Sequence, residues 1–283
     1  MRVAPLSDQR GTSVSVLLYK SVHLAGEPDY AMCSRIFGLH IVPILLCFLM
    51  GLAFVISYAM AATLDHISIL FPYISDTGTW VPESCIFGQL LNMAATLSAV
   101  SAYLWYKQAN ARLIVSLRPL MRCRCRAALC FGLLSSLGIS LVANFQETAV
   151  WAVHLTGAAL LYCCGLVYFA IVTNVSHHYL DSKQWALRVV LCSCATISAI
   201  ILPVAGTVAR FRYDGKNIRK WTPEDRGYVY HAVSSFAEWV LAICCLGFSL
   251  TMVAELKDYS ILAVKLKNHR TRHSRESTIT LTE

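Results

Sequence analysis

The chain has 283 residues, of which 57% are hydrophobic and only 14% are charged. Soluble domains carry about 25% charged residues, and the apolar residues here form runs long enough to cross a bilayer, so the composition excludes an ordinary soluble fold. The formal net charge is +8, but the basic residues flank apolar runs and form no basic, aromatic-rich surface, which argues against nucleic acid as a partner. The sequence therefore predicts a polytopic membrane protein.

Residues 1–35 form a polar segment of mixed character with four basic residues. It contains no short apolar core followed by a small-residue cleavage site, so we expect no cleaved signal peptide and a first span that acts as a signal anchor. We interpret the segment as a cytosolic leader without a fixed fold.

Six apolar runs follow, each close to or longer than the roughly 20 residues that a helix needs to cross the hydrocarbon core. They predict an all-α fold, a single bundle of six transmembrane helices. The third run is rich in Gly and Ser, which let helices approach closely, so we expect it to be buried in the bundle. The predicted spans are about 36–64, 85–106, 127–143, 149–173, 189–209 and 232–254.

The distribution of Lys and Arg predicts that both chain termini are cytosolic. With that orientation, 18 of the 24 basic residues lie in cytosolic segments, among them a basic tail at 255–283, and the first two outer loops carry none. The last outer loop, 210–231, carries the remaining six, and long loops tolerate such charge.

The first outer loop contains several residues that fix the backbone conformation, which a simple connector between two spans would not need. Pro72 and Pro82 fix φ and bias the preceding residues toward extended backbone. Residues 76–78 can form an Asx-type turn, and Glu83 stands where a helix would begin. We interpret residues 71–90 as a structured loop that caps the non-cytosolic mouth of the bundle.

Strongly polar side chains inside spans are expensive and mark functional sites by default. Gln89, Asn92, His154 and Glu238 lie within predicted spans, all in the outer half of the membrane under this topology. We expect them to join the first outer loop in one outward-facing pocket roofed by that loop. The candidate residues are Ser75, Asp76, Thr77, Gly78, Thr79, Pro82, Glu83, Gln89, Asn92, Asn144, His154, His231 and Glu238.

Three interpretations of this pocket stay open. The first is a set of interhelical hydrogen bonds, worth about 0.6–2 kcal/mol each, that fix the helix register. The second is a site for lipid or a small ligand, and the third is catalysis by Asp76 or Glu238 beside His154. The sequence has no spaced metal-ligand pattern, nucleophile elbow or phosphate-binding loop, so we expect no catalytic residue, no metal and no cofactor.

The twelve cysteines do not predict a disulfide framework. Most of them lie inside apolar runs, where Cys behaves as a small hydrophobic residue. Cys123 and Cys125 alternate with arginines just before the third run, without the second ligand pair of a zinc site. They are candidates for palmitoylation, and two reduced thiols in a basic loop are the alternative.

Several motifs resemble the damage-regulated autophagy modulator (DRAM) family. The longest is Phe71-Pro-Tyr-Ile-Ser-Asp-Thr-Gly-Thr79, which is followed by Pro82-Glu83-Ser-Cys-Ile-Phe-Gly88. The resemblance covers about residues 32–256. Shorter matches follow in the same order along the chain, at 91–93, 106–108, 142–146, 154–157, 221–223, 227–231 and 238–239.

The resemblance implies a six-span protein of lysosomal or endosomal membranes that promotes autophagy, with the plasma membrane as an alternative location. The wider superfamily includes branches that remodel GPI-anchor lipids or are linked to phosphoinositide supply. A lipid-remodelling factor or enzyme is therefore the alternative function, and a transporter or channel is the third. Family members begin close to the first span, so Met32 is an alternative start that would leave out residues 1–31.

The tail contains one candidate sorting signal. Tyr259-Ser-Ile-Leu262 fits a sorting signal made of a tyrosine and a bulky apolar residue, which adaptors read as an extended peptide. The clustered Lys and Arg of the tail favour anionic cytosolic leaflets. The expected partners are membrane lipids, cytosolic sorting adaptors and the autophagy machinery.

Overall fold

The computed structural model describes residues 15–20, 38–115, 119–257 and 259–265. The chain divides into a helical unit, residues 39–257, and a second unit made of the two terminal segments. In the second unit, strands β1 (Ser15–Lys20) and β2 (Tyr259–Lys265) pair antiparallel. The sequence predicts no strand in either segment, and both residues of the expected sorting signal, Tyr259 and Leu262, lie in β2.

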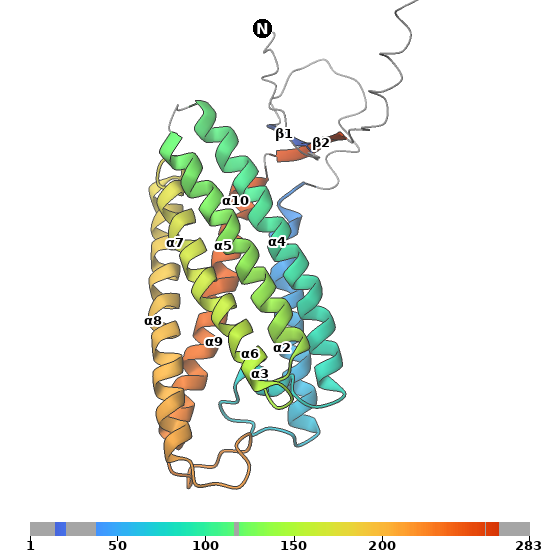
Figure 1. The fold of residues 1–283 in the computed structure, drawn as a ribbon, viewed down its shortest axis with the longest axis vertical. Coiled ribbons are helices and arrows are strands. Elements are labelled where there is room, and N and C mark those ends of the chain that lie inside the picture. The colour runs from blue at the N-terminus through green and yellow to red at the C-terminus, as the bar shows by residue number, and fades with distance from the viewer. Residues whose placement is uncertain (1–14, 21–37, 116–118, 258, 266–283) are drawn as a thin grey trace, which may run out of the picture. The chain divides into compact units, whose positions relative to one another are not determined.

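The described part of the helical unit contains six helices that are long and apolar enough to cross a membrane, which confirms the predicted all-α, six-span fold (Figure 1). A single-turn helix, α3 (Ile74–Thr77), lies in the first outer loop. The spans are α2 (Ile41–Thr63), α4 (Glu83–Val115), α5 (Pro119–Asn144), the broken helix α6–η1–α7 (Trp151–Ala159, Leu160–Cys164, Gly165–Ser176), α8 (Ser182–Arg212), and α9 (Tyr228–Thr251) with its extension α10 (Val253–Leu256).

Several helices are longer than their apolar runs. α4 has 33 residues and α8 has 31, so at 1.5 Å per residue each is about 45–50 Å long, against a hydrocarbon core of about 30 Å. The start of α8 is capped by the Asp181 carboxylate, which accepts hydrogen bonds from the backbone N–H groups of Lys183 and Gln184. The last span is also longer than predicted, because α10 extends it to Leu256, beyond the predicted end at residue 254.

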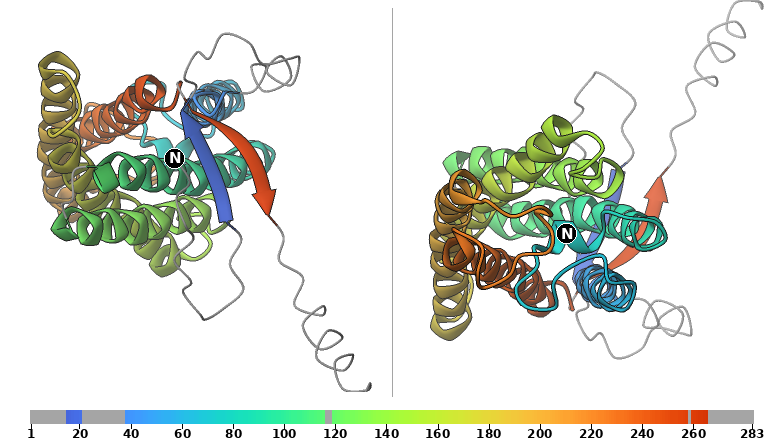
Figure 2. Two further views of the ribbon diagram at one scale, coloured as in Figure 1. Left: turned by 90° about the horizontal axis from the view of Figure 1, so that it is seen from above. Right: turned by 90° about the horizontal axis from the view of Figure 1, so that it is seen from below.

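The third span, α5, packs against α4 and against the α6–η1–α7 helix. It is not buried on all sides as expected, because Leu133, Leu134 and Leu137 are 44%, 40% and 50% exposed. Gly138 allows the close approach, because a Cβ there would collide with backbone atoms of Gly157 and Leu161. Where η1 forms a π-helical turn, Ser135 of α5 donates a hydrogen bond to the Leu161 carbonyl oxygen at 2.8 Å. On the other side of the bundle, α8 packs mainly on α9 and forms one flank in both views of Figure 2.

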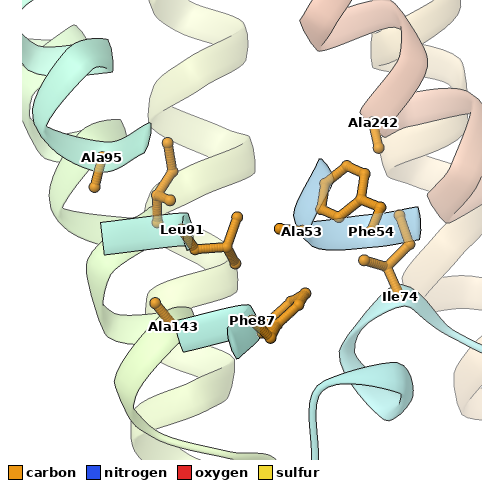
Figure 3. Close-up of a cluster of buried hydrophobic side chains, with 9 residues drawn as sticks. Ala53, Phe54, Ile74, Phe87, Leu91, Ala95, Ala143 and Ala242 are labelled. Carbon is orange, nitrogen blue, oxygen red and sulfur yellow. The ribbon is translucent and has the colours of Figure 1, made fainter. Parts of the chain in front are cut away.

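The first outer loop belongs to the hydrophobic core of the unit. In Figure 3, Ile74 of α3 lies beside Phe54 of α2, and Phe87 of α4 completes the same cluster. Residues 74–77 form a helical turn where the sequence suggested an Asx turn. Gly78 has a φ of −108°, so it serves by its small size, because a Cβ at Gly78 would overlap the ring of Phe87.

Candidate functional site

Helix α9 holds the first outer loop from one side. The Glu238 carboxylate accepts a hydrogen bond of 2.7 Å from the Ile74 backbone N–H, which is one of the free N–H groups at the start of α3. Ser235 Oγ and Trp239 Nε1 both donate to the Pro72 carbonyl oxygen, at 2.7 and 3.0 Å. Polar side chains of α9 therefore satisfy backbone groups of the loop.

Helix α2 holds the same loop from the opposite side. Tyr58 Oη donates to the Ile69 carbonyl oxygen at 2.8 Å, and Ser57 Oγ lies 2.8 Å from Thr77 Oγ1. Both Ser57 and Thr77 are fully buried. Within the loop, Thr79 Oγ1 donates a hydrogen bond to the Ser75 carbonyl oxygen. α2 and α9 are thus connected through the loop.

Two residues of α3 contact charged side chains from the other loops. Ser75 Oγ donates to Glu147 Oε2 at 3.3 Å, and Asp76 Oδ1 lies 3.6 Å from Arg219 Nε. Burial and the nearby Glu147 raise the pKa of the Asp76 carboxyl well above its usual range, and the Arg219 guanidinium offsets them only in part. This carboxyl therefore takes up a proton far more readily than an exposed aspartate.

The long outer loop, 213–227, is bound to the first one. Lys220 Nζ lies 2.6 Å from Asp65 Oδ2, and this hydrogen bond lowers the pKa of Asp65. The Ser68 N–H donates to the Arg219 carbonyl oxygen at 3.2 Å, and Ser68 Oγ donates to the Trp221 carbonyl oxygen at 2.9 Å. These contacts place Arg219 and Lys220, two of the six basic residues that break the charge pattern, against the first loop.

Glu83 forms a separate pair at the start of α4, after the cis peptide bond between Val81 and Pro82. Its Oε1 lies 2.5 Å from His66 Nδ1, and its side chain has no exposed surface. Its Oε2 has no hydrogen-bond partner among the residues that the structure describes. The helix begins at Glu83, as the sequence predicted.

A small cavity lies directly beneath α3. Its volume is about 60 Å³, which is room for about two water molecules at about 30 Å³ each. Three of the expected pocket residues, Ser75, His154 and Glu238, line it together with apolar side chains such as Phe54 and Leu161. The roof comes from Ile74 and Ser75 of the first loop. The cavity is therefore mainly apolar, with Ser75, His154 and Glu238 among its few polar lining residues.

The other expected residues lie elsewhere. Asn92 and Asn144 form a pair across α4 and α5, in which each amide donates to the other's oxygen at 2.9 Å. His231 stacks on the Trp221 ring at 4.4 Å between centroids, and Gln89 is exposed on the surface of α4. His154 Nδ1 donates to the Phe145 carbonyl oxygen at 2.7 Å. The structure therefore replaces one pocket by a loop-holding network, a small cavity and an amide pair.

At the opposite end of the bundle, sequence reasoning missed a buried ionic cluster. Arg188 and Glu255 form a hydrogen-bonded salt bridge in which neither side chain has exposed surface. Arg188 also donates to Ser176 Oγ at 2.5 Å and to Thr251 Oγ1 at 2.8 Å. Each charged residue lies one position outside a predicted span, so we assigned Arg188 to a loop and Glu255 to the tail. Opposite charges at the same ends of two adjacent spans were the available signal.

The two candidate acylation sites differ in access. Cys123 is exposed, whereas Cys125 has no exposed surface. The Cys125 thiol is buried against the rest of the bundle in α5, beyond reach of a modifying enzyme. Of the two, only Cys123 is sterically open to palmitoylation.

Comparison with known proteins locates the chain in a family. Residues 38–259 match the family model described as "Frag1/DRAM/Sfk1/Cwh43P N-terminal domain". The chain is 37% identical over 231 residues to DNA damage-regulated autophagy modulator protein 2 of Bos taurus, which covers 79% of this chain and 86% of that protein. No solved structure matches the chain.

Two more distant relatives extend the same match. The chain is 34% identical over 234 residues to DNA damage-regulated autophagy modulator protein 1 of Homo sapiens, with 79% of this chain and 93% of that protein covered. It is 30% identical over 224 residues to "Modulator of macroautophagy TMEM150B" of Danio rerio, with 76% and 84% covered. The matched region contains all six spans and the network that holds the first loop, and the chain therefore belongs to the DRAM family of membrane proteins.

Proposed function

We propose that this protein is a non-enzymatic multi-pass protein of lysosomal or endosomal membranes that promotes autophagy. The observation that carries the proposal is the similarity, over about four fifths of the chain, to proteins named as autophagy modulators. The fold adds a physical argument for a non-enzymatic role. The acid that lines the cavity, Glu238, already accepts a hydrogen bond from the Ile74 N–H, and the cavity has a volume of only about 60 Å³.

The location is tested by microscopy of the C-terminally tagged protein against lysosomal markers, with autophagic flux measured in the same cells. We expect lysosomal signal, reduced flux after depletion, and a shift to the plasma membrane for Tyr259→Ala, because the tyrosine is the residue that an adaptor would bind. Leu113→Met, a change within the bundle, serves as the matched control. Residence in the Golgi apparatus with normal flux would contradict the proposal.

A lipid-remodelling enzyme is the second candidate, and one observation favours it: His154 and Glu238 line the same cavity. Two substitutions at Glu238 separate the functions. The amide oxygen of Glu238→Gln can still accept the hydrogen bond from the Ile74 N–H, whereas Glu238→Ala leaves that buried donor unpaired, at a cost of about 1–3 kcal/mol. We expect Gln to preserve expression, location and flux and Ala to reduce all three. An inactive Glu238→Gln protein with normal expression and location would favour the enzyme.

The raised pKa of Asp76 predicts how the outer network responds to pH. A carboxyl whose pKa is higher in the folded than in the unfolded protein binds its proton more tightly when folded, so its contribution to stability is present at low pH and is lost as pH rises through the folded-state pKa. This direction suits a face of the protein that lies in an acidic lumen. We expect the purified protein to have a higher Tm at about pH 5 than at about pH 7, and Asp76→Asn to reduce that difference.

The control for this measurement is the exposed Glu224, replaced by Gln. It should leave the pH dependence of Tm unchanged, because this side chain is exposed and lies outside the network around α3. An Asp76→Asn protein whose Tm depends on pH as strongly as that of the parent would show that other groups govern the response.

A further inference from the structure

The first outer loop exposes three consecutive large apolar side chains. Ile69, Leu70 and Phe71 are 68%, 62% and 44% exposed, although the residues that follow, from Pro72 to Ile74, are held firmly between two helices. An apolar patch of this kind in contact with water would favour aggregation, and such patches mark surfaces that bind a partner or a membrane.

The position of these residues along the helices points to the membrane. The Ile69 carbonyl oxygen accepts a hydrogen bond from Tyr58, which lies five residues before the end of α2 and therefore about 7 Å below it. The Pro72 carbonyl oxygen accepts from Ser235, which lies seven residues after the start of α9, about 10 Å from that end. The chain thus leaves α2 at Thr63 and turns back below the ends of both helices.

Part of the backbone around this segment is bound by protein side chains. Non-helical backbone at membrane depth is tolerated where protein covers it. Side chains from α2 and α9 bind the carbonyl oxygens of Ile69 and Pro72 and the N–H of Ile74. Pro72 itself carries no N–H that would need a partner.

The helices on both sides present apolar surface at the same level. Val55 of α2 is 67% exposed and Phe236 of α9 is 59% exposed, as expected of side chains that face lipid tails. The last outer loop differs from residues 69–71, because its exposed side chains include the charged Lys216 and Glu224. The apolar surface at 69–71 therefore continues the lipid-facing surface of the spans.

We propose that residues 69–71 form a re-entrant segment whose side chains enter the outer, non-cytosolic leaflet and contact lipid acyl chains between α2 and α9. This inference is independent of the proposed role in autophagy and holds for whichever cellular membrane contains the protein.

The test places a genetically encoded, environment-sensitive fluorescent amino acid at Leu70 of the full-length protein, reconstituted in phosphatidylcholine vesicles. The same fluorescent amino acid in place of Lys216, in the last outer loop, is the matched control. At position 70 we expect blue-shifted emission, strong quenching by lipids with a nitroxide on the acyl chain, and little quenching by iodide in the buffer. At position 216 we expect the opposite: strong quenching by iodide and little quenching by the acyl-chain nitroxide.

Ile69 serves as a second labelling position in case the label at 70 prevents folding. Quenching by iodide at 69 or 70 to the same extent as at 216, with no effect of the acyl-chain nitroxide, would overturn the proposal and assign the patch to the aqueous side, where a protein partner would have to cover it. Since no cell-based readout enters this measurement, its failure is distinguishable from a failure of the proposed function.

Discussion

Replacing Arg188 with methionine should destabilise the protein by about 3–5 kcal/mol, because it leaves the Glu255 carboxylate buried without its cation. Both side chains are fully buried. The arginine also bonds Ser176 of α7 and Thr251 of α9, so its loss removes the contacts that join three helices at this end of the bundle. The measurement is thermal unfolding of the purified full-length protein in detergent, together with its expression level in cells.

Two controls show whether the loss comes from an unpaired charge. The double variant Arg188→Met with Glu255→Leu removes both charges and should recover much of the stability, since an apolar replacement of a buried ion pair is often neutral. The exposed pair of Arg226 and Asp214 in the outer loop is the matched surface case, where Arg226→Met should have little effect. An Arg188→Met protein that is as stable as the parent would contradict the assigned role of the cluster.

Placing a side chain at position 138 should separate two spans. A Cβ on Gly138 would lie 2.6 Å from the Gly157 carbonyl oxygen and 2.8 Å from the Leu161 Cα, and these backbone atoms cannot rotate away as a flexible side chain can. We expect Gly138→Ala to cost about 1–3 kcal/mol through overpacking, and Gly138→Leu to reduce expression further. Expression level and Tm in detergent are again the readouts.

The chain supplies a matched control in another span. A Cβ on Gly51 of α2 would meet no atom within 4 Å, so Gly51→Ala should be neutral or stabilise the helix by about 0.5–1 kcal/mol through lower backbone entropy in the unfolded state. If Gly138→Ala and Gly51→Ala changed Tm equally, the loss of stability in Gly138→Ala could not be assigned to the close approach of α5 to the π-helical turn.

The six spans could be predicted from the sequence because the bilayer imposes a length on apolar runs that no other part of the fold can change. The order in the first outer loop could also be predicted, because Pro72 restricts the backbone locally and Glu83 starts α4 as expected. The close packing of α5 against its neighbours follows from its small residues, which act through size alone.

What the sequence could not determine is which polar side chains meet. A helix that is apolar on all sides has no polar face to define its rotation about its own axis, so nothing local indicates that Glu238 points at α3 while Gln89 faces outward. The hydrogen bond from Ile74 to Glu238 spans 164 residues and the pair of Arg188 and Glu255 spans 67. Only the packed bundle decides such contacts, because it sets which helices are neighbours and how each is rotated.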